Sequence, residues 1–159
     1  MSAALLIPDW PAPAGVHAAF TLRGRGGADG ASRGNYRYFN LGDHVGDDPG
    51  AVASNRSRLQ EALGARPVFL QQVHGVSVAA LGPGAADGWV ADAAVTRTRR
   101  LACTVMVADC LPVLLALADG SAVAAAHAGW RGLAAGVLER TVAQLRGSRV
   151  HAPIVAWLG

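Results

Sequence analysis

Three residues of this chain share a local context in which ligands or catalytic groups often occur. His74 stands in QQVHG, Cys110 in MVADC and His127 in AAAHAG, and each follows an apolar stretch with the pattern of a strand. In open α/β sheets, sites form where strands end and the chain turns. We therefore expect these three side chains to meet at one edge of a sheet.

The donor set of these residues, two imidazoles and one thiolate, is typical of zinc. Three protein ligands leave a fourth position open, which is the arrangement of catalytic zinc sites. Zinc lowers the pKa of a bound water to about 7, so such a site supports hydrolysis at neutral pH. The spacing adds little to this hypothesis, because the chain contains neither a CxxC nor an HExxH motif.

The same residues also support two interpretations without a metal. Cys110 can act as a nucleophile with His127 as its base, and Asp109 then orients that base or simply caps the turn. Because a thiolate is not readily both a tight zinc ligand and a free nucleophile, this hypothesis competes with the zinc site. The other interpretation without a metal is structural: two hydrogen-bonded histidines at strand ends and one buried thiol.

Other polar motifs carry weaker signals. Trp130 and Arg131 open a predicted helix, where backbone N–H groups and a guanidinium favour an anion, or where arginine is solvated and tryptophan packs. The arginine cluster at 97–100 has the pattern of a solvated turn rather than of a phosphate-backbone contact. The glycine-rich stretch at 23–30 resembles a dinucleotide-binding motif, but no helical pattern follows it.

Composition narrows the function classes. All 14 basic residues are arginine, so no Schiff-base lysine exists, and a formal charge of +3 does not predict a nucleic-acid partner. No apolar run is long enough to span a membrane, and the N-terminal stretch lacks a signal-peptide pattern, so we expect a cytoplasmic protein. Cys103 and Cys110 lie too far apart along an extended chain for a disulfide and are expected to remain thiols.

The first half of the chain predicts a strand at 15–22, a long glycine-rich loop and then a helix. Asp48 is the expected N-cap, Pro49 the first helical residue and Gly64 the stop, with Val52, Leu59 and Leu63 on the buried stripe. The stretch 67–81 is expected to form two short strands that meet at His74.

The second half predicts buried strands followed by one helix. Four segments are continuously apolar, which is typical of strands covered on both faces. They are 91–98, 101–109, 111–119 and 121–129. The helix is expected at 130–147 and a last strand at 151–159; the residues expected to face the core from the helix are Leu133, Val137, Leu138, Val142 and Leu145. With 159 residues, these elements predict one domain, a mixed α/β sheet with helices packed on it. Because the sequence stops at Gly159, directly after an apolar predicted strand, we expect the complete domain to continue further.

Five motifs in order closely resemble the YfiH family, also called the laccase-domain or multicopper polyphenol oxidase family and peptidoglycan editing factor. They are FNLGDHVGDDPGAVASNR, QQVHG, ADAAVT, VADCLPVLL and HAGWRGLAAGVLERTV, and the likeness covers about residue 10 to 159. The resemblance implies a single-domain, three-layer α/β/α fold with a mixed sheet, like that of a bacterial cytotoxic-factor deamidase. It also implies that the domain continues past Gly159.

The resemblance further implies a metal site, usually zinc with copper as an alternative, held by His74, Cys110 and His127. Family members are described as purine nucleoside phosphorylases that act on adenosine, inosine and methylthioadenosine, with adenosine deaminase activity. The implied partners are a purine nucleoside and phosphate, with no nucleic acid and no membrane. Arg23 and Arg131 are candidates to hold phosphate, and Asn40 and His44 are candidates to contact the substrate.

Three hypotheses stay open at this point. The first is a zinc-dependent purine nucleoside phosphorylase. The second is a cysteine hydrolase or amidase that edits peptidoglycan precursors, with Cys110 as its nucleophile. A further alternative, which follows an older label of the family, is copper-dependent oxidation of phenols. The third is an inactive binding module. The preferred nucleoside, the physiological role and the oligomeric state are not indicated by the sequence.

Overall fold

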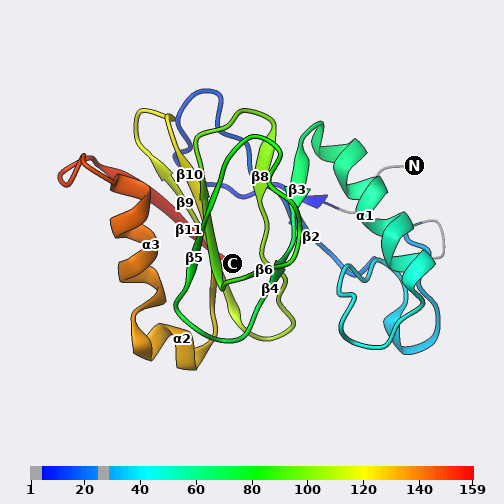
Figure 1. Cartoon of the computed structure of the whole chain (residues 1–159). Helices are drawn as coiled ribbons and strands as arrows, with labels where there is room; N and C mark the ends of the chain where they lie inside the picture. Colours follow the sequence, from blue (N-terminus) through cyan, green and yellow to red (C-terminus); the bar gives the residue numbers. More distant parts are fainter. Residues whose placement is uncertain (1–4, 25–28) are drawn as a thin grey trace. The chain divides into compact units, whose positions relative to one another are not determined.

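The computed structural model describes residues 5–24 and 29–159, which fall into two compact units. Unit 1 comprises residues 1–8 and 19–66, and unit 2 comprises residues 9–18 and 67–159. Figure 1 traces both units in colours that follow the chain. Positions 25–28 of the glycine-rich motif lie outside the described residues.

Unit 1 contains one long helix and a short antiparallel ribbon. Strand β1 (Leu5–Leu6) pairs with β2 (Phe20–Thr21), so the strand expected at 15–22 is much shorter than predicted. A 3-10 turn, η1 (Gly34–Tyr36), follows, and then helix α1 (Pro49–Leu63).

The signals that predict α1 are confirmed at both ends of the helix. The side chain of Asp48 accepts a hydrogen bond from Ala51 N–H, and Pro49 takes the first helical position, where no N–H is needed. Gly64 ends the helix in the left-handed conformation at φ 59°. Val52 and Leu59 are buried as expected, and Asn55 is buried between them on the same face.

The buried Asn55 organises the loop that precedes α1. Its side-chain oxygen accepts from Ala31 N–H, and its amide N–H₂ donates to the carbonyls of Tyr38 and Asn40 and to the Ser32 hydroxyl. A buried amide of this kind needs all its partners within the fold. These hydrogen bonds join the loop of unit 1 to helix α1.

Unit 2 is built on a five-stranded mixed sheet with the order β11-β9-β10-β7-β5. The strands are β5 (Val78–Leu81), β7 (Ala93–Thr96), β9 (Leu111–Leu117), β10 (Val123–Ala128) and β11 (Ile154–Leu158). Neighbours are antiparallel from β11 to β7, and β5 is parallel to β7. Two further pairs join β3 (Arg66–Val68) to β8 (Leu101–Cys103) and β4 (Leu70–Gln71) to β6 (Trp89–Val90).

Apolar clusters cover both faces of the sheet, as the continuous apolar runs predict. One face packs against α3 (Val137–Arg146), with Val137 and Leu145 fully buried on β10 and β7. The other face carries a second cluster that includes Val68, Ala94 and Leu101, from β3, β7 and β8. Figure 1 shows α2 and α3 on one side of the strands and β3, β4 and β8 on the other. The mixed α/β fold is thereby confirmed.

The secondary structure differs from expectation in two further places. The stretch 67–81 forms three short strands instead of two. The single helix expected at 130–147 is two helices, α2 (Trp130–Ala135) and α3, because Gly136 adopts φ 95° and ends the first one. As a result, Leu133 faces solvent with 43% of its surface exposed instead of packing in the core. Within the described residues, no helix combines the length and apolarity needed to cross a bilayer.

Candidate metal centre

His74, Cys110 and His127 converge in unit 2, as their residue types predict. One potential ligand atom from each residue lies within 4.8 Å of the others, and Cys110 Sγ is 3.8 Å from His74 Nε2. The two imidazole rings meet edge to face, with centroids 4.7 Å apart. A tetrahedral zinc ion holds its nitrogen and sulfur ligands about 3.3–3.6 Å from one another. The three side chains therefore fit one metal ion with only small movements.

Antiparallel pairing explains how Cys110 and His127 come together. His127 is near the end of β10, whereas Cys110 directly precedes the first residue of β9. In the β9–β10 pair, Leu111 stands opposite Ala128, so the beginning of one strand lies beside the end of the other. The expectation that Cys110 ends a strand is therefore wrong, because β8 already stops at Cys103, but the expected edge of the sheet is right.

His74 occupies the turn between β4 and β5 in an unusual backbone conformation. Its φ of 59° lies in the left-handed region, which residues other than glycine adopt infrequently. Backbone N–H groups of Val73, His74 and Gly75 all donate to the carboxylate of Asp92, at 3.2, 2.8 and 2.7 Å. One carboxylate thus holds the turn that carries the first ligand.

The same carboxylate also contacts His127, and both groups are buried. His127 Nδ1 lies 2.9 Å from Asp92 Oδ1, and His127 N–H donates to the Asp92 carbonyl at 2.7 Å. Burial by itself would raise the pKa of Asp92, but the hydrogen bonds from His127 and the three backbone N–H groups together lower it. Asp92 is therefore a carboxylate with its negative charge beside the His127 ring.

Sequence reasoning missed Asp92, although the residue leaves a signal. It is an acidic residue in the apolar stretch VADAAV, directly before β7, and its side chain is fully buried. A buried charge requires partners that compensate its lost hydration. An acidic residue within a predicted buried strand should accordingly count as a candidate site residue.

Asp109, which was expected to orient His127 or to cap the turn, lies beside the thiol instead. Asp109 is exposed, and the carboxylate in contact with His127 is that of Asp92. Burial raises the pKa of the Cys110 thiol, and the negative charge of Asp109 and a hydrogen bond with it raise that pKa further. A catalytic role for Asp109 stays a prediction.

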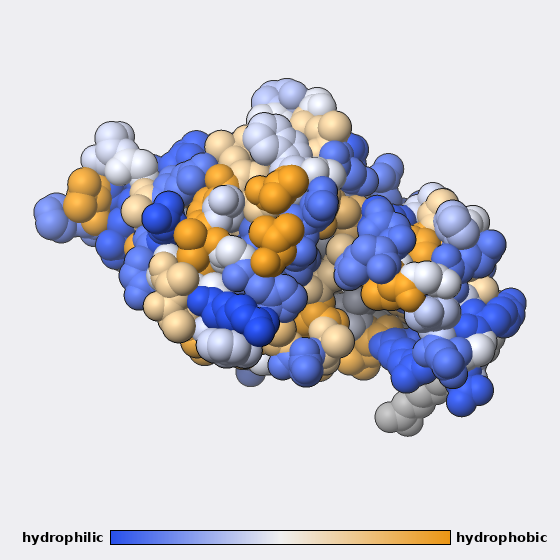
Figure 2. Space-filling model, turned by 60° about the horizontal axis from the view of Figure 1, so that its bottom comes forward, coloured by the Kyte–Doolittle hydropathy of each residue, from blue (hydrophilic) through white to orange (hydrophobic). Residues whose placement is uncertain are grey.

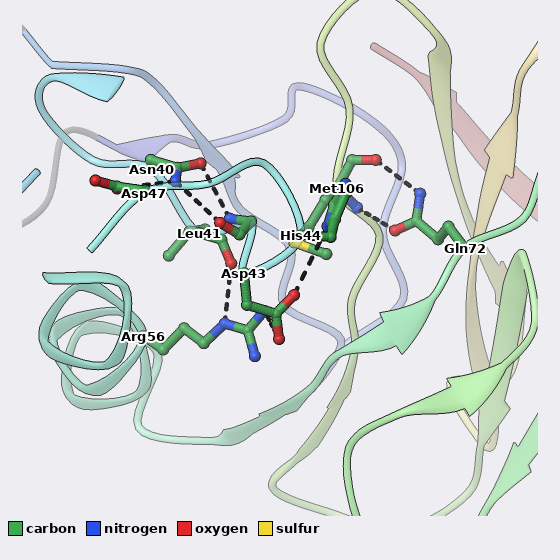
Figure 3. Close-up of polar contacts among 9 residues, drawn as sticks. Asn40, Leu41, Asp43, His44, Asp47, Arg56, Gln72 and Met106 are labelled. Carbon is green, nitrogen blue, oxygen red and sulfur yellow. Dashed lines mark hydrogen bonds and ion pairs between the residues drawn. The ribbon is translucent and has the colours of Figure 1, made fainter. Parts of the chain in front are cut away.

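Gln72 connects the His74 turn with the segment that leads to Cys110. Its side-chain N–H donates to the Met106 carbonyl at 2.8 Å, and its side-chain oxygen accepts from Met106 N–H at 2.7 Å. Figure 3 shows these two parallel hydrogen bonds on its right-hand side. Gln72 therefore joins the segments that hold two of the three ligands.

Gly129 provides the close approach that the cluster needs. A Cβ atom at this position would lie 3.0 Å from Cys110 Sγ, 3.0 Å from His74 Cδ2 and 3.7 Å from His127 Cε1. The backbone at φ −63° and ψ 154° is open to any residue, so the requirement for glycine here is steric and not conformational. The three ligands pack directly against the backbone before α2.

Comparison with known proteins identifies the family. The family model described as multi-copper polyphenol oxidoreductase laccase matches residues 17–159, which include parts of both units. The chain belongs to this laccase-like family. The likeness to the YfiH family that the motifs indicate is thereby confirmed.

Curated relatives of this laccase-like chain carry the name purine nucleoside phosphorylase. The protein PA4543 of Pseudomonas aeruginosa is 50% identical over 156 residues, and YfiH of Escherichia coli is 46% identical over 157 residues. Each alignment covers 98% of this chain but only 61% and 62% of the relative. The chain thus spans about three fifths of the length of these relatives.

Two solved structures share the fold of this laccase-like chain. The protein NMB0706 of Neisseria meningitidis matches with a TM-score of 0.85 and 46% identity, over 98% of this chain and 62% of that one. YlmD of Geobacillus stearothermophilus matches with a TM-score of 0.78 and 30% identity, over 94% and 61% of the two chains. The described arrangement of strands and helices is therefore that of the family.

The motif Trp130-Arg131 of this laccase-like chain lies at the start of α2. Trp130 is not a packing anchor, because 71% of its surface is exposed, and the guanidinium of Arg131 stacks 4.7 Å above its ring centroid. Figure 2 shows the face on the side of α2, where apolar residues form small groups among polar ones. Arg131 is exposed, and its binding of an anion stays a prediction.

The other candidates for substrate contact belong to unit 1. The Arg23 guanidinium donates to the carbonyls of Arg37 and Asn35. The Asn40 side chain forms hydrogen bonds with Gly42 and with Asp47, and Figure 3 shows Asn40 beside Asp47. His44 is exposed and lies 3.7 Å from Asp43. Roles for Arg23, Asn40 and His44 toward a substrate therefore stay predictions, and their described contacts stabilise the loop of unit 1.

Proposed function

We propose that this chain forms the metal centre of a zinc-dependent purine nucleoside phosphorylase, with adenosine deamination as a side activity. The observation that carries the proposal is the convergence of two imidazoles and one thiol at a single edge of the sheet. The names of the relatives point to the same class of enzyme. Inosine, adenosine and methylthioadenosine are the proposed substrates, together with phosphate.

The residues present fit a divalent metal. The Asp92 carboxylate lies 2.9 Å from Nδ1 of His127, which leaves the other ring nitrogen of His127 for a metal. A metal ion held there supplies Lewis acidity and lowers the pKa of bound water. A zinc ion and a copper ion both accept this mixed nitrogen and sulfur donor set, and we propose zinc because the three ligands leave one position for substrate.

In phosphorolysis, a phosphate oxygen forms a bond to the sugar carbon as the bond from that carbon to the purine nitrogen breaks. The purine leaves with the electron pair and takes up a proton. We propose that Arg131, an exposed guanidinium that follows His127 closely in sequence, and Arg23 bind the phosphate, and that Asn40 and His44 contact the nucleoside. In deamination, the oxygen of water replaces the amino group of adenosine, which leaves as ammonia.

The deciding assay incubates the zinc-loaded chain with inosine, with and without phosphate, and detects hypoxanthine and ribose 1-phosphate by chromatography. We expect release that depends on phosphate and that falls at least about 100-fold in His127→Ala, since one of three ligands is lost. Asp119→Asn is the matched control, because Asp119 lies in the turn after β9 and pairs with Ser121 and Arg149. Adenosine in place of inosine reports deamination as formation of inosine.

Three outcomes contradict the proposal. The first is a zinc-loaded chain that releases no hypoxanthine when phosphate is present. The second is a metal-depleted protein that keeps an amidase activity and becomes acylated at Cys110, which favours a cysteine hydrolase. The third is copper retained in place of zinc on purification, with oxidation of phenols and no phosphorolysis.

A further inference from the structure

We propose that Asp92 is a positioning residue that arranges His74 and His127 as ligands before any metal binds. The inference rests on the proposed metal centre and adds to it a residue that touches neither metal nor substrate. It concerns how the site is prepared, and it is independent of which substrate the centre serves.

Each carboxylate oxygen of Asp92 makes two contacts. Oδ1 accepts from the His74 N–H and faces His127 Nδ1, at 2.8 and 2.9 Å. Oδ2 accepts from Gly75 N–H and Val73 N–H, at 2.7 and 3.2 Å. An ionised carboxylate offers about four acceptor positions, so its capacity is fully used within the protein. All four donors belong to the two segments that carry the histidine ligands.

For His127, this contact selects one tautomer. A carboxylate only accepts hydrogen bonds, so the proton of the neutral ring is on Nδ1 and the lone pair is on Nε2. The hydrogen bond from His127 N–H to the Asp92 carbonyl fixes the backbone of the same pair. The ring is 4% exposed, so it has little room to turn toward another partner.

For His74, Asp92 stabilises a backbone conformation that the residue would otherwise rarely adopt. A φ of 59° is costly for a side chain with a Cβ atom and persists only where the surroundings enforce it. Three successive N–H groups directed at one carboxylate provide that constraint. The ring of His74 is thereby presented to Cys110 Sγ, 3.8 Å away.

A purely structural role for Asp92 predicts a different result. If the carboxylate only caps the turn, its replacement lowers stability but leaves the ring proton of His127 and the intrinsic metal affinity unchanged. The variant Asp92→Asn separates the two roles, because asparagine keeps the size and one acceptor oxygen but places an N–H₂ donor near the histidine. We expect the His127 proton to move to Nε2, which removes the lone pair needed by the metal.

The experiment compares the wild-type chain with Asp92→Asn and with the control Asp119→Asn, whose carboxylate is hydrogen-bonded at the surface. Long-range ¹⁵N–¹H spectra of the metal-free proteins report the tautomer of His127. Competition with a chelator measures Zn²⁺ affinity, and Co²⁺ spectra report thiolate ligation by Cys110. We expect the Nδ1–H tautomer in wild type and a Zn²⁺ affinity lower by about 10- to 100-fold in Asp92→Asn only.

The inference is overturned if metal-free wild type carries the His127 proton on Nε2, a result that holds even when Asp92→Asn does not fold. It is also overturned if the folded Asp92→Asn variant binds Zn²⁺ as tightly as wild type does. Failure of the proposed metal centre looks different, because wild type itself then shows no thiolate band with Co²⁺. Failure of the phosphorolysis assay with intact Zn²⁺ binding leaves the role of Asp92 unaffected.

Discussion

Gly129 is the residue whose smallness the candidate metal centre most depends on. It lies between the last strand residue, Ala128, and the first residue of α2, and it packs against all three ligands. Because its backbone angles suit any residue, replacing it tests packing at the site without adding backbone strain.

We predict that Gly129→Ala lowers Zn²⁺ affinity by about 10-fold or more while the protein stays folded. The new methyl group would lie 3.0 Å from both Cys110 Sγ and His74 Cδ2, which is tighter than most Cβ contacts, so these ligands must shift by a few tenths of an ångström. Competition with a chelator measures the affinity, and circular dichroism checks the fold. Gly82→Ala is the matched control, because nothing lies within 4 Å of the Cβ atom it adds. Equal affinity in both variants would contradict the packing argument.

At this scale, residue chemistry predicts the ligands but not their surroundings. His74, Cys110 and His127 are recognisable because their side chains bind metals and their positions mark the ends of apolar stretches. Asp92 was not predicted: its place in an apolar stretch signals a buried charge, but its partner His127 follows only from the strand register. For Trp130 the sequence left open whether the ring packs, and the structure shows it exposed.

Among the elements, those with strong local signals were predictable. Helix α1 has an N-cap, a proline and a terminal glycine that each act within one turn, so its bounds follow from the sequence. The helix end at Gly136 was not predictable in this way. A glycine inside a helical pattern can be tolerated or can end the helix, and tertiary packing decides between the two. The segment after β8 was equally ambiguous, since an apolar run does not tell a strand from a buried irregular stretch.

The segment that leads to Cys110 is irregular and therefore depends on side-chain hydrogen bonds for its position. Met106 lies between β8 and β9, and the Gln72 amide pairs with both of its backbone groups. A backbone segment outside the sheet ladder gains its order from such contacts. Gln72 thus holds the segment that leads to Cys110 beside the turn that carries His74.

We predict that Gln72→Leu lowers the free energy of unfolding by about 1–3 kcal/mol, because two backbone groups lose their partners. We also expect weaker Zn²⁺ binding, since the segment before Cys110 is no longer joined to the His74 turn. Urea unfolding and chelator competition measure the two effects. The neighbouring Gln71→Leu is the control, because the Gln71 side chain is exposed. Comparable losses in both variants would show that the amide of Gln72 is not what orders the segment.

At the scale of the whole molecule, the two cysteines differ in environment and so in their effect on stability. Both are free thiols. Cys103, in β8, donates to the Val123 carbonyl, and burial raises the pKa of its thiol to about 12. The unfolded chain has the ordinary thiol pKa of 9.0, so the two states take up protons differently only at alkaline pH.

We predict that the free energy of unfolding is unaffected by Cys103 below pH 9 and falls as the pH rises from 9 toward 12. In that window the unfolded thiol ionises while the native thiol stays protonated, which favours the unfolded state by at most about 1.4 kcal/mol per pH unit. Urea unfolding of wild type and Cys103→Ser under reducing conditions between pH 8 and about 10.5 measures this difference, since other titrating groups are common to both proteins. Serine keeps the hydrogen-bond donor but does not titrate in this range. Parallel stability curves for the two proteins would mean that the Cys103 thiol ionises as readily in the native state as in the unfolded chain.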